Sequence, residues 1–234
     1  MGKTSFAMNI ATNVARRAQK DVVTFNLEMS SDQLATRILS TESLVESNAL
    51  RSGRISAEDW VKLATSAGYL STLPLYIDDT ASMTVQQMKA KLRRVKNLGL
   101  VIIDYLQLMD SSSKSDNRVV VISEITRQIK VMAKELNVPV ILLSQLSRAV
   151  ENRTDKRPML SDLRESGSIE QDADIVLFLY NESYYSREKT PRSIAECIVA
   201  KNRHGETGTV KLVWDGKYTR FSNPENDEPP ESIQ

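Results

Sequence analysis

The chain has 234 residues with 41% hydrophobic and 26% charged side chains, which is typical of a soluble globular protein large enough to form a sizeable core. Its net charge of +1 excludes a generally basic nucleic-acid coat protein, so any contact with nucleic acid must be local. One cysteine, one histidine and the lack of a membrane-length apolar run argue against a disulfide framework, a histidine-rich metal site and a membrane span.

The first hundred residues predict helices that alternate with strands. Apolar residues recur every three or four positions in residues 5–20, which indicates a helix with one buried face. Residues 22–28 form a β-branched run typical of a buried strand, and residues 75–77 form a shorter one. Serine or threonine caps predict the starts of further helices, at Ser30 or Ser31, at Ser56 and at Thr84.

The same alternation continues beyond residue 100. Residues 100–104 and 138–144 are apolar runs with polar ends, as expected for central parallel strands, and a long amphipathic helix lies between them. Residues 111–117 are polar and predict a mobile loop. Residues 146–172 are mostly charged, and we expect a long loop there with one short helix at most.

Three late strands complete the predicted fold, at residues 175–180, 194–200 and 210–214. The fold class is therefore α/β, with a mostly parallel central sheet flanked by helices and a C-terminal antiparallel strand pair. One domain is expected over residues 1–222, followed by a disordered, acidic, proline-containing tail at residues 223–234.

The tripeptide Gly2-Lys3-Thr4 looks like the closing half of a phosphate-binding P-loop, G-x-x-x-x-G-K-[ST]. In such a loop the backbone N–H groups surround the phosphates, the lysine reaches the β- and γ-oxygens, and the hydroxyl ligates Mg²⁺. The following helix would direct its positive end at the same phosphates. A tripeptide is a weak signal, and an ordinary helix start is by itself the commoner explanation.

Polar residues follow several of the predicted strands and should meet at one edge of a parallel sheet. Asp104 has the form of an acid that holds Mg²⁺ through water, although a helix-capping acid is an equally good interpretation. Glu28 fits a base that orients water, or a solvated acid. Arg203 fits an arginine finger directed at a neighbour's nucleotide, or a solvated hairpin tip. The expected cluster comprises Glu28, Asp78, Asp104 and Gln145.

Five motifs in order make the chain resemble the C-terminal motor domain of the DnaB-type replicative DNA helicases of bacteria. The resemblance extends from Gly2 to about Phe221 and implies a RecA-like ATPase core. It also implies a homohexameric ring with ATP between subunits. The motifs are Leu27-Glu28-Met29-Ser30, residues 101–107 (VIIDYLQ), residues 144–148 (SQLSR), residues 160–174 (LSDLRESGSIEQDAD) and Ala200-Lys201-Asn202-Arg203.

The resemblance also implies roles for individual residues, with ATP and Mg²⁺ as cofactors. Gly2 and Lys3 would bind phosphate, Thr4 and Asp104 would hold Mg²⁺, and Glu28 would polarise water. Gln145 would sense the γ-phosphate, Arg203 with Lys201 would enter the adjacent subunit's site, and Arg37 would contact the nucleotide or lie on a helix surface. The DNA-binding residues would be Arg164, Glu165 and Gly167, in a pore loop or, more simply, a capped surface turn.

The family pattern places a strand, the first half of the P-loop and an N-terminal domain before residue 1. We therefore expect this chain alone to bind ATP poorly. In the full-length protein, single-stranded DNA, a primase and a helicase loader are the implied partners, in the bacterial cytoplasm at the replisome and without a membrane. Two alternatives remain open: a RecA-like recombinase that does not unwind DNA, and an inactive module that retains only the ring-forming surface.

Overall fold

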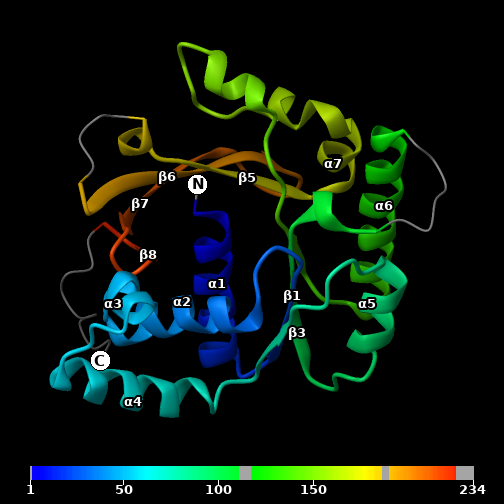
Figure 1. Cartoon of the computed structure of the whole chain (residues 1–234). Coiled ribbons are helices and arrows are strands. Elements are labelled where there is room, and N and C mark those ends of the chain that lie inside the picture. Colours follow the sequence, from blue (N-terminus) through cyan, green and yellow to red (C-terminus); the bar gives the residue numbers. More distant parts are fainter. Residues whose placement is uncertain (1, 111–116, 186–189, 225–234) are drawn as a thin grey trace, which may run out of the picture.

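The computed structural model describes residues 2–110, 117–185 and 190–224 of the chain. They form two four-stranded sheets, a parallel one in the order β2-β1-β3-β4 and an antiparallel one in the order β5-β6-β7-β8 (Figure 1). The parallel strands are β1 (Asp21–Asn26), β2 (Leu75–Asp78), β3 (Leu98–Asp104) and β4 (Val140–Leu142). The antiparallel strands are β5 (Ile175–Tyr180), β6 (Arg192–Asn202), β7 (Gly208–Asp215) and β8 (Arg220–Ser222).

The helices of the described residues connect and cover these sheets, and none of them is long and apolar enough to span a membrane. The α-helices are α1 (Lys3–Ala18), α2 (Ser31–Ser43), α3 (Ser47–Ser52), α4 (Ala57–Leu70), α5 (Val85–Leu92), α6 (Arg118–Leu136) and α7 (Gly167–Asp172). The short 3₁₀ helices are η1 (Leu106–Leu108), η2 (Arg148–Asn152), η3 (Leu160–Ser166) and η4 (Glu182–Tyr184).

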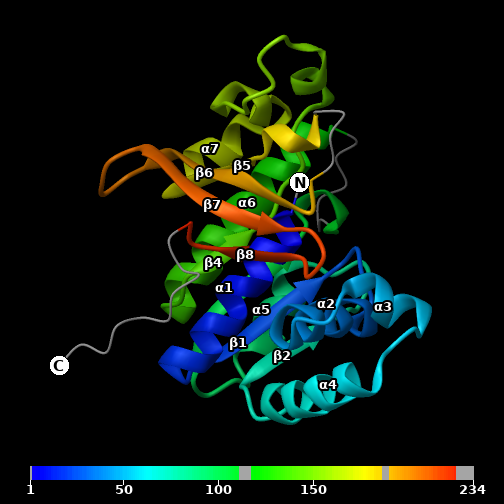
Figure 2. The same ribbon diagram turned by 90° about the vertical axis from the view of Figure 1, so that its left-hand side faces the viewer.

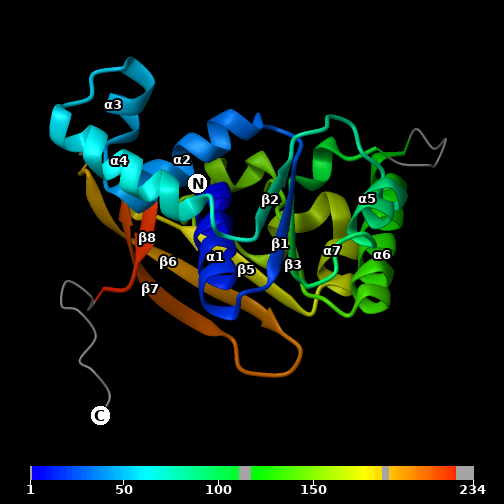
Figure 3. The same ribbon diagram turned by 90° about the horizontal axis from the view of Figure 1, so that it is seen from below.

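The parallel sheet is buried on both faces because its strands are apolar at nearly every position. On one face Phe25, Val101 and Ile103 pack against α5 and α6. On the other face Leu100 and Ile102 pack against α1 and α2. Side chains alternate along a strand, so a continuous apolar run supplies both layers at once. Figure 3 shows α5 and α6 on one side of β1 and β3, and α1 on the other.

Helix α1 lies between the two sheets and joins them (Figures 1 and 3). Its Asn9 side chain accepts a hydrogen bond of 2.9 Å from the backbone N–H of Phe221 in β8. The ring of Phe6 meets the ring of Phe221 edge-on, with the ring centroids 5.5 Å apart. In Figure 2 the antiparallel sheet lies in front of α1. The antiparallel strands are thereby fixed against the first turns of α1.

Two of the predicted helix starts are reciprocal capping boxes. The Ser30 hydroxyl accepts from the backbone N–H of Gln33, whose side chain accepts from the Ser30 backbone N–H. Thr84 and Gln87 make the same exchange at the start of α5. Each box pairs two backbone donors that the helix itself leaves free. Ser56 also caps its helix, by accepting from the N–H of Asp59.

The predicted α/β organisation is confirmed, but three details of the prediction were wrong: the loop at residues 146–172, the end of β1 and the length of β4. Residues 146–172 contain three helical segments, η2, η3 and α7, because buried Leu163 anchors this charged stretch beneath β5. The expected antiparallel pair is present as β6 and β7, and β5 and β8 extend it to a four-stranded sheet. Strand β1 ends at Asn26, before Glu28, and β4 is shorter than residues 138–144. Residues 111–116 of the expected loop and 225–234 of the expected tail lie outside the described residues.

Candidate functional site

The N-terminus of α1 is shaped by Gly2, whose φ of +67° is in the left-handed region that favours glycine. A Cβ at this position would lie 2.9 Å from Cζ of Phe221, so a side chain would also collide with β8. Lys3 is the first residue of the helix and Thr4 the second. The tripeptide therefore presents the free backbone N–H groups of a helix start, an ammonium and a hydroxyl from one turn of chain.

The Lys3 side chain extends across the carboxyl end of the parallel sheet. Its Nζ donates a hydrogen bond of 2.9 Å to the backbone carbonyl of Ser144, just after β4. Burial lowers the pKa of Lys3, while the negative charges of Asp104 and Glu28 oppose that shift. The ammonium thus lies in a partly desolvated position, where its attraction for an anion is strengthened, and the two nearby carboxylates partly offset that attraction.

Asp104 ends β3, with only 3% of its surface exposed. Its Oδ2 accepts a hydrogen bond of 2.6 Å from the Thr4 hydroxyl. Burial raises the pKa of Asp104; the Thr4 hydrogen bond and the charges of Lys3 and Arg37 oppose this, whereas Glu28 adds to it. A buried carboxylate with a raised pKa at the end of an apolar strand is a common feature of functional sites.

The Thr4 hydroxyl and the Asp104 carboxylate suit Mg²⁺ as ligands or as partners of its bound water. Mg²⁺ prefers hard oxygen atoms, keeps several waters and takes only one or two protein oxygens when phosphates supply the rest. Among residues 2–110, 117–185 and 190–224, no group of three or more His, Cys, Asp or Glu side chains could hold a metal ion by itself. The donor set therefore fits a metal that arrives with a phosphate ligand.

Replacing Asp104 with asparagine is expected to raise the melting temperature at pH 7 in the absence of nucleotide. Because the pKa is raised in the folded state, the folded state binds the proton more tightly than the unfolded state does. Stability from this group is therefore present at low pH and is lost as the pH rises from 3.8, the ordinary value, through the raised pKa. Asparagine avoids that loss and can still accept from Thr4.

Thermal unfolding between pH 4 and pH 8 tests this expectation for Asp104. The difference in melting temperature between the variant and the unchanged protein should grow with pH. Asp110→Asn is the matched control, because Asp110 is exposed a few residues further along the chain. A lower melting temperature for Asp104→Asn at pH 7 would contradict a net cost of the buried charge.

Glu28 and Arg37 are both exposed and lie beside this cluster. Each acts electrostatically on Asp104, Glu28 by raising its pKa and Arg37 by lowering it. Leu27, next to Glu28, donates its backbone N–H to the carbonyl of Asp104 at 2.7 Å, which holds the bend after β1 against the end of β3. The predicted residues of β1, β3 and α1 are thus brought together.

Gln145 is exposed and follows β4, and the side-chain amide of Gln107 forms hydrogen bonds to this segment through both its oxygen and its nitrogen. The side-chain Oε1 of Gln107 accepts from the backbone N–H of Gln145 at 3.2 Å, and its Nε2 donates to the Ser144 hydroxyl at 3.0 Å. Since Ser144 also accepts from Lys3, Gln145 is one residue away from the ammonium. This turn links the candidate site to η1 and the residues beyond it.

Asp78 does not join the cluster, contrary to the expectation from its place at a strand end. Its carboxylate pairs with Lys91 of α5 and accepts from the backbone N–H of Thr80 at 3.1 Å. Desolvation raises the pKa of Asp78, but the hydrogen bonds from Lys91 and Thr80 outweigh it and leave the pKa below its usual value. Strand β2 is the outer strand next to β1, and its end is used to fix α5.

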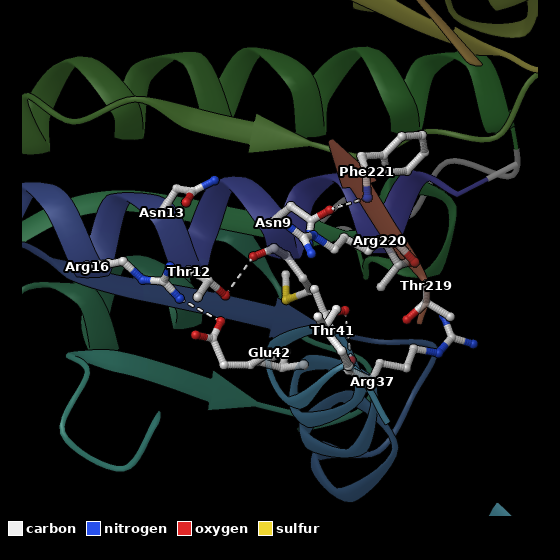
Figure 4. Close-up of a pocket in the computed structure, with 15 residues that line it drawn as sticks. Asn9, Thr12, Asn13, Arg16, Arg37, Thr41, Glu42, Thr219, Arg220 and Phe221 are labelled. Carbon is white, nitrogen blue, oxygen red and sulfur yellow. Dashed lines mark hydrogen bonds and ion pairs between the residues drawn. The ribbon is translucent and has the colours of Figure 1, made fainter. Parts of the chain in front are cut away.

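A cavity of about 220 Å³ opens beside the cluster, between α1, α2 and the segment that leads into β8 (Figure 4). It starts at Thr4 and follows one face of α1 as far as Arg16, which is ion-paired with Glu42. Arg37 and Arg220 border it from opposite sides (Figure 4). The polar residues that line it include Asn9, Thr12, Asn13, Thr41 and Thr219.

Lys201 and Arg203 lie away from this cluster, at the end of β6 in the other sheet. The Lys201 ammonium donates to the backbone carbonyl of Glu170 in α7. Arg203 is ion-paired with Asp174 at 3.2 Å. Arg164 and Glu165 are in η3, and Gly167 begins α7. The basic pair and the expected DNA loop are therefore neighbours of each other.

Several contributors to the site were not predicted from the sequence. They are backbone or long-range partners: the Ser144 carbonyl, the Gln107 side chain and the Asn9 and Phe221 pair that fixes β8 beside α1. One sequence pattern could have indicated the contact between α1 and β8. Ser5, Asn9 and Thr12 recur at helical spacing, so they place polar side chains on one side of a helix that is otherwise largely apolar.

A family model described as the DnaB-like helicase C terminal domain matches residues 1–223. The replicative DNA helicase DnaB of Geobacillus stearothermophilus is 52% identical over 229 residues, which cover 96% of this chain and 50% of that protein. The replicative DNA helicase DnaC of Bacillus subtilis (strain 168) gives the same identity and coverage. The chain thus spans about half the length of these relatives.

Two solved structures are similar to the whole fold. The first, described as an ATPase domain, superposes with a TM-score of 0.91 and 42% identity over 96% of this chain and 81% of that one. The second, a DnaB-like replicative helicase described together with its interactions with primase, gives the same TM-score and identity over 96% of this chain and 55% of that one. The predicted RecA-like core is confirmed by these similarities.

Proposed function

The chain belongs to the DnaB-like helicase C-terminal domain family, and on that basis we propose that it is the motor of a replicative DNA helicase. Hydrolysis of ATP would drive its movement along single-stranded DNA and so separate the duplex. The observation that carries the proposal is the contact of Thr4 with Asp104, beneath the start of α1 and beside Lys3. An anion site and a metal site at one helix start are what phosphate chemistry needs.

In this proposal Lys3 and the N–H groups after Gly2 hold the β- and γ-phosphates of ATP. Thr4 and Asp104 would hold Mg²⁺, which would supply positive charge to the phosphates. Glu28 accepts a hydrogen bond from the attacking water and orients it, since its exposed carboxylate is close enough to act electrostatically on both Lys3 and Asp104.

Gln145 completes the site by reporting whether the γ-phosphate is present. Its turn is fixed by Gln107, and Gln107 also accepts, through its backbone carbonyl, from Arg118 at the start of α6. A shift of Gln145 would therefore reach α6. These hydrogen bonds link the backbone of Gln145 to the helix that packs against α5 and α7.

The cavity next to Thr4 would receive the sugar and base of the nucleotide. Its volume of about 220 Å³ is of nucleoside size, and it opens beside the helix start that holds the phosphates. Arg37 and Arg220 on its borders can stack on a base or pair with a phosphate.

Arg203 would act on the nucleotide of an adjacent copy in a homohexameric ring. Its neighbours are Asp174 and α7, and it follows the end of β6 in the antiparallel sheet, whereas Lys3 begins α1. A cation on the γ-phosphate stabilises the transition state for phosphoryl transfer, and one supplied from a partner makes hydrolysis depend on assembly. Lys201 would support Arg203 from the same strand end.

Single-stranded DNA would bind at the segment around Arg164, Glu165 and Gly167. One arginine and exposed backbone N–H groups near a glycine can hold a phosphate without reading bases. Six copies around a ring would add their contacts, which explains how a chain of net charge +1 can hold DNA. We further propose primase and a helicase loader as partners of the full protein, and the bacterial cytoplasm as its location.

An unwinding assay tests the proposal. It uses a forked DNA duplex and the full gene product that contains this chain. ATP-dependent strand separation is expected, together with ATP hydrolysis stimulated by single-stranded DNA. DNA-stimulated hydrolysis without unwinding would favour a RecA-like recombinase. No hydrolysis at all would favour an inactive ring module.

Replacing Arg164 with alanine is expected to weaken binding of single-stranded DNA equally for all base sequences. The loss of one phosphate contact should also lower the slope of log K against log salt by about 0.7 for each contact removed. Fluorescence anisotropy with homopolymers of two bases, at several salt concentrations, measures both effects. Arg54→Ala, at an exposed position between α3 and α4, is the control. A loss confined to one base sequence would contradict a phosphate contact.

A further inference from the structure

Asp174 lies just before β5, at one end of the antiparallel sheet, and both of its carboxylate oxygens have partners. Its Oδ1 is 3.2 Å from Nη1 of Arg203, and its Oδ2 accepts a hydrogen bond from the ammonium of Lys130 in α6. The backbone N–H of Arg203 also donates to the carbonyl of Asp174 at 2.9 Å. The hydrogen bond from Lys130 leads the interactions that hold the pKa of Asp174 below its usual value, and Arg203 adds to them.

The register of the antiparallel sheet places these residues opposite each other. Ile175, the first residue of β5, pairs with Asn202, the last residue of β6. Asp174 and Arg203 are the next residues outward on the two strands. The ion pair therefore continues the strand pairing, and its position is fixed by the backbone of both strands.

Helix α7 contacts the same basic residues through its backbone. Gln171 accepts from Nη2 of Arg203 at 3.5 Å, and Glu170 accepts from the Lys201 ammonium. The carboxylate of Asp172, at the end of α7, accepts from Thr126 of α6 at 2.6 Å. Helix α7 follows directly on η3, so any displacement of η3 reaches the carbonyls that hold Lys201 and Arg203.

The Arg203 side chain is 47% exposed, so solvent alone would leave its long chain free to adopt many rotamers. A cation that acts on a transferring phosphoryl group must be placed within a fraction of an ångström of its position. An anchored carboxylate with one oxygen on Arg203 and the other on Lys130 supplies that restriction.

We propose that Asp174, anchored by Lys130, is a positioning residue for Arg203, and that α7 transmits the position of η3 to the same arginine. The proposal rests on the function of Arg203 proposed above. It assigns the coupling between DNA binding and hydrolysis to the polar contacts among α7, α6 and the ends of β5 and β6. Asp174 itself does not touch the nucleotide.

Replacing Asp174 with asparagine should lower kcat for DNA-stimulated ATP hydrolysis by about 10- to 100-fold, as for a misplaced catalytic group. KM for ATP and the ring size should be unchanged, because the variant's own phosphate site is intact. Lys130→Met should change kcat in the same direction. Lys134→Met, one turn further along α6 and exposed, is the matched control and should behave as the unchanged protein.

Rings that contain subunits of two different variants show whether Asp174→Asn misplaces Arg203 or damages the subunit in general. Subunits with Asp174→Asn keep their own phosphate site, and subunits with Lys3→Ala keep Asp174 and Arg203. At an interface where an Asp174→Asn site faces a Lys3→Ala neighbour, an anchored Arg203 is restored. A mixture of the two variants should therefore hydrolyse ATP several-fold faster than the sum of the separate variants.

The outcomes distinguish this inference from the function on which it rests. If the unchanged protein hydrolyses ATP with DNA and Asp174→Asn matches it, the positioning role is wrong and the motor function stands. A fall in kcat with no gain in mixed rings would also overturn the inference, because the damage would then lie within the variant's own site. If the unchanged protein shows no DNA-stimulated hydrolysis, the proposed function itself fails.

Discussion

Replacing Arg203 with alanine is expected to reduce the turnover number of DNA-stimulated ATP hydrolysis by at least about a thousandfold. The affinity for ATP should change by less than about threefold, because a cation that acts on the γ-phosphate mainly in the transition state contributes little to ground-state binding. This is a larger loss than that expected for Asp174→Asn, since the alanine variant has no guanidinium left to position.

The measurement compares the dissociation constant of a slowly hydrolysed ATP analogue with kcat from steady-state hydrolysis. Arg54→Ala again serves as a control, with both quantities unchanged. Mixing Arg203→Ala with Lys3→Ala subunits should restore part of the activity if the arginine acts on a neighbour's site. If binding and turnover fall together in Arg203→Ala, the side chain belongs to its own subunit's nucleotide site.

Local signals predicted the parallel half of the fold well. The helix caps at Ser30 and Thr84 and the apolar run before Asp104 depend on residues within a few positions of each other, so the sequence predicts them directly. The cluster of Lys3, Thr4 and Asp104 also followed, because strand ends of a parallel sheet meet at one edge.

The antiparallel half was predicted less well because its structure depends on distant contacts. Strand β8 is only three residues long and is fixed by the hydrogen bond from Phe221 to Asn9, which are far apart in the sequence. The segments η2, η3 and α7 have little periodicity, and Leu163 is buried through packing against Val176 and Phe178. No local sequence pattern predicts such contacts.

The separation of the basic pair from the phosphate cluster is the feature that most constrains a mechanism. Lys3 and Asp104 belong to the parallel sheet and α1, whereas Arg203 belongs to the antiparallel sheet and α7. If one chain contained the whole site, the end of β6 would have to lie against the start of α1, whereas it lies against α7. Two copies placed side by side can instead bring the arginine of one to the lysine of the other, so that hydrolysis reports on assembly.

Replacing Lys3 with methionine is expected to weaken ATP binding by about 100-fold or more, because a charge-assisted contact to phosphate is worth about 3 kcal/mol in a partly desolvated site. Methionine keeps the apolar stem and removes only the charge. The same change leaves Asp104 and Glu28 without the cation between them, so the pKa of Asp104 should rise further. The variant should therefore lose affinity for the phosphates of ATP.

Titration calorimetry with ATP and Mg²⁺ in the full protein measures this loss for Lys3→Met. Lys20→Met is the matched control, because Lys20 lies just beyond α1 and its Nζ is bonded to Asn97 at 2.8 Å, away from the site. The two single substitutions give opposite signatures: Lys3→Met should lose binding, and Arg203→Ala should lose turnover with binding retained. Wild-type affinity in Lys3→Met would contradict the assignment of Gly2-Lys3-Thr4 as the phosphate site, whatever the outcome for Arg203.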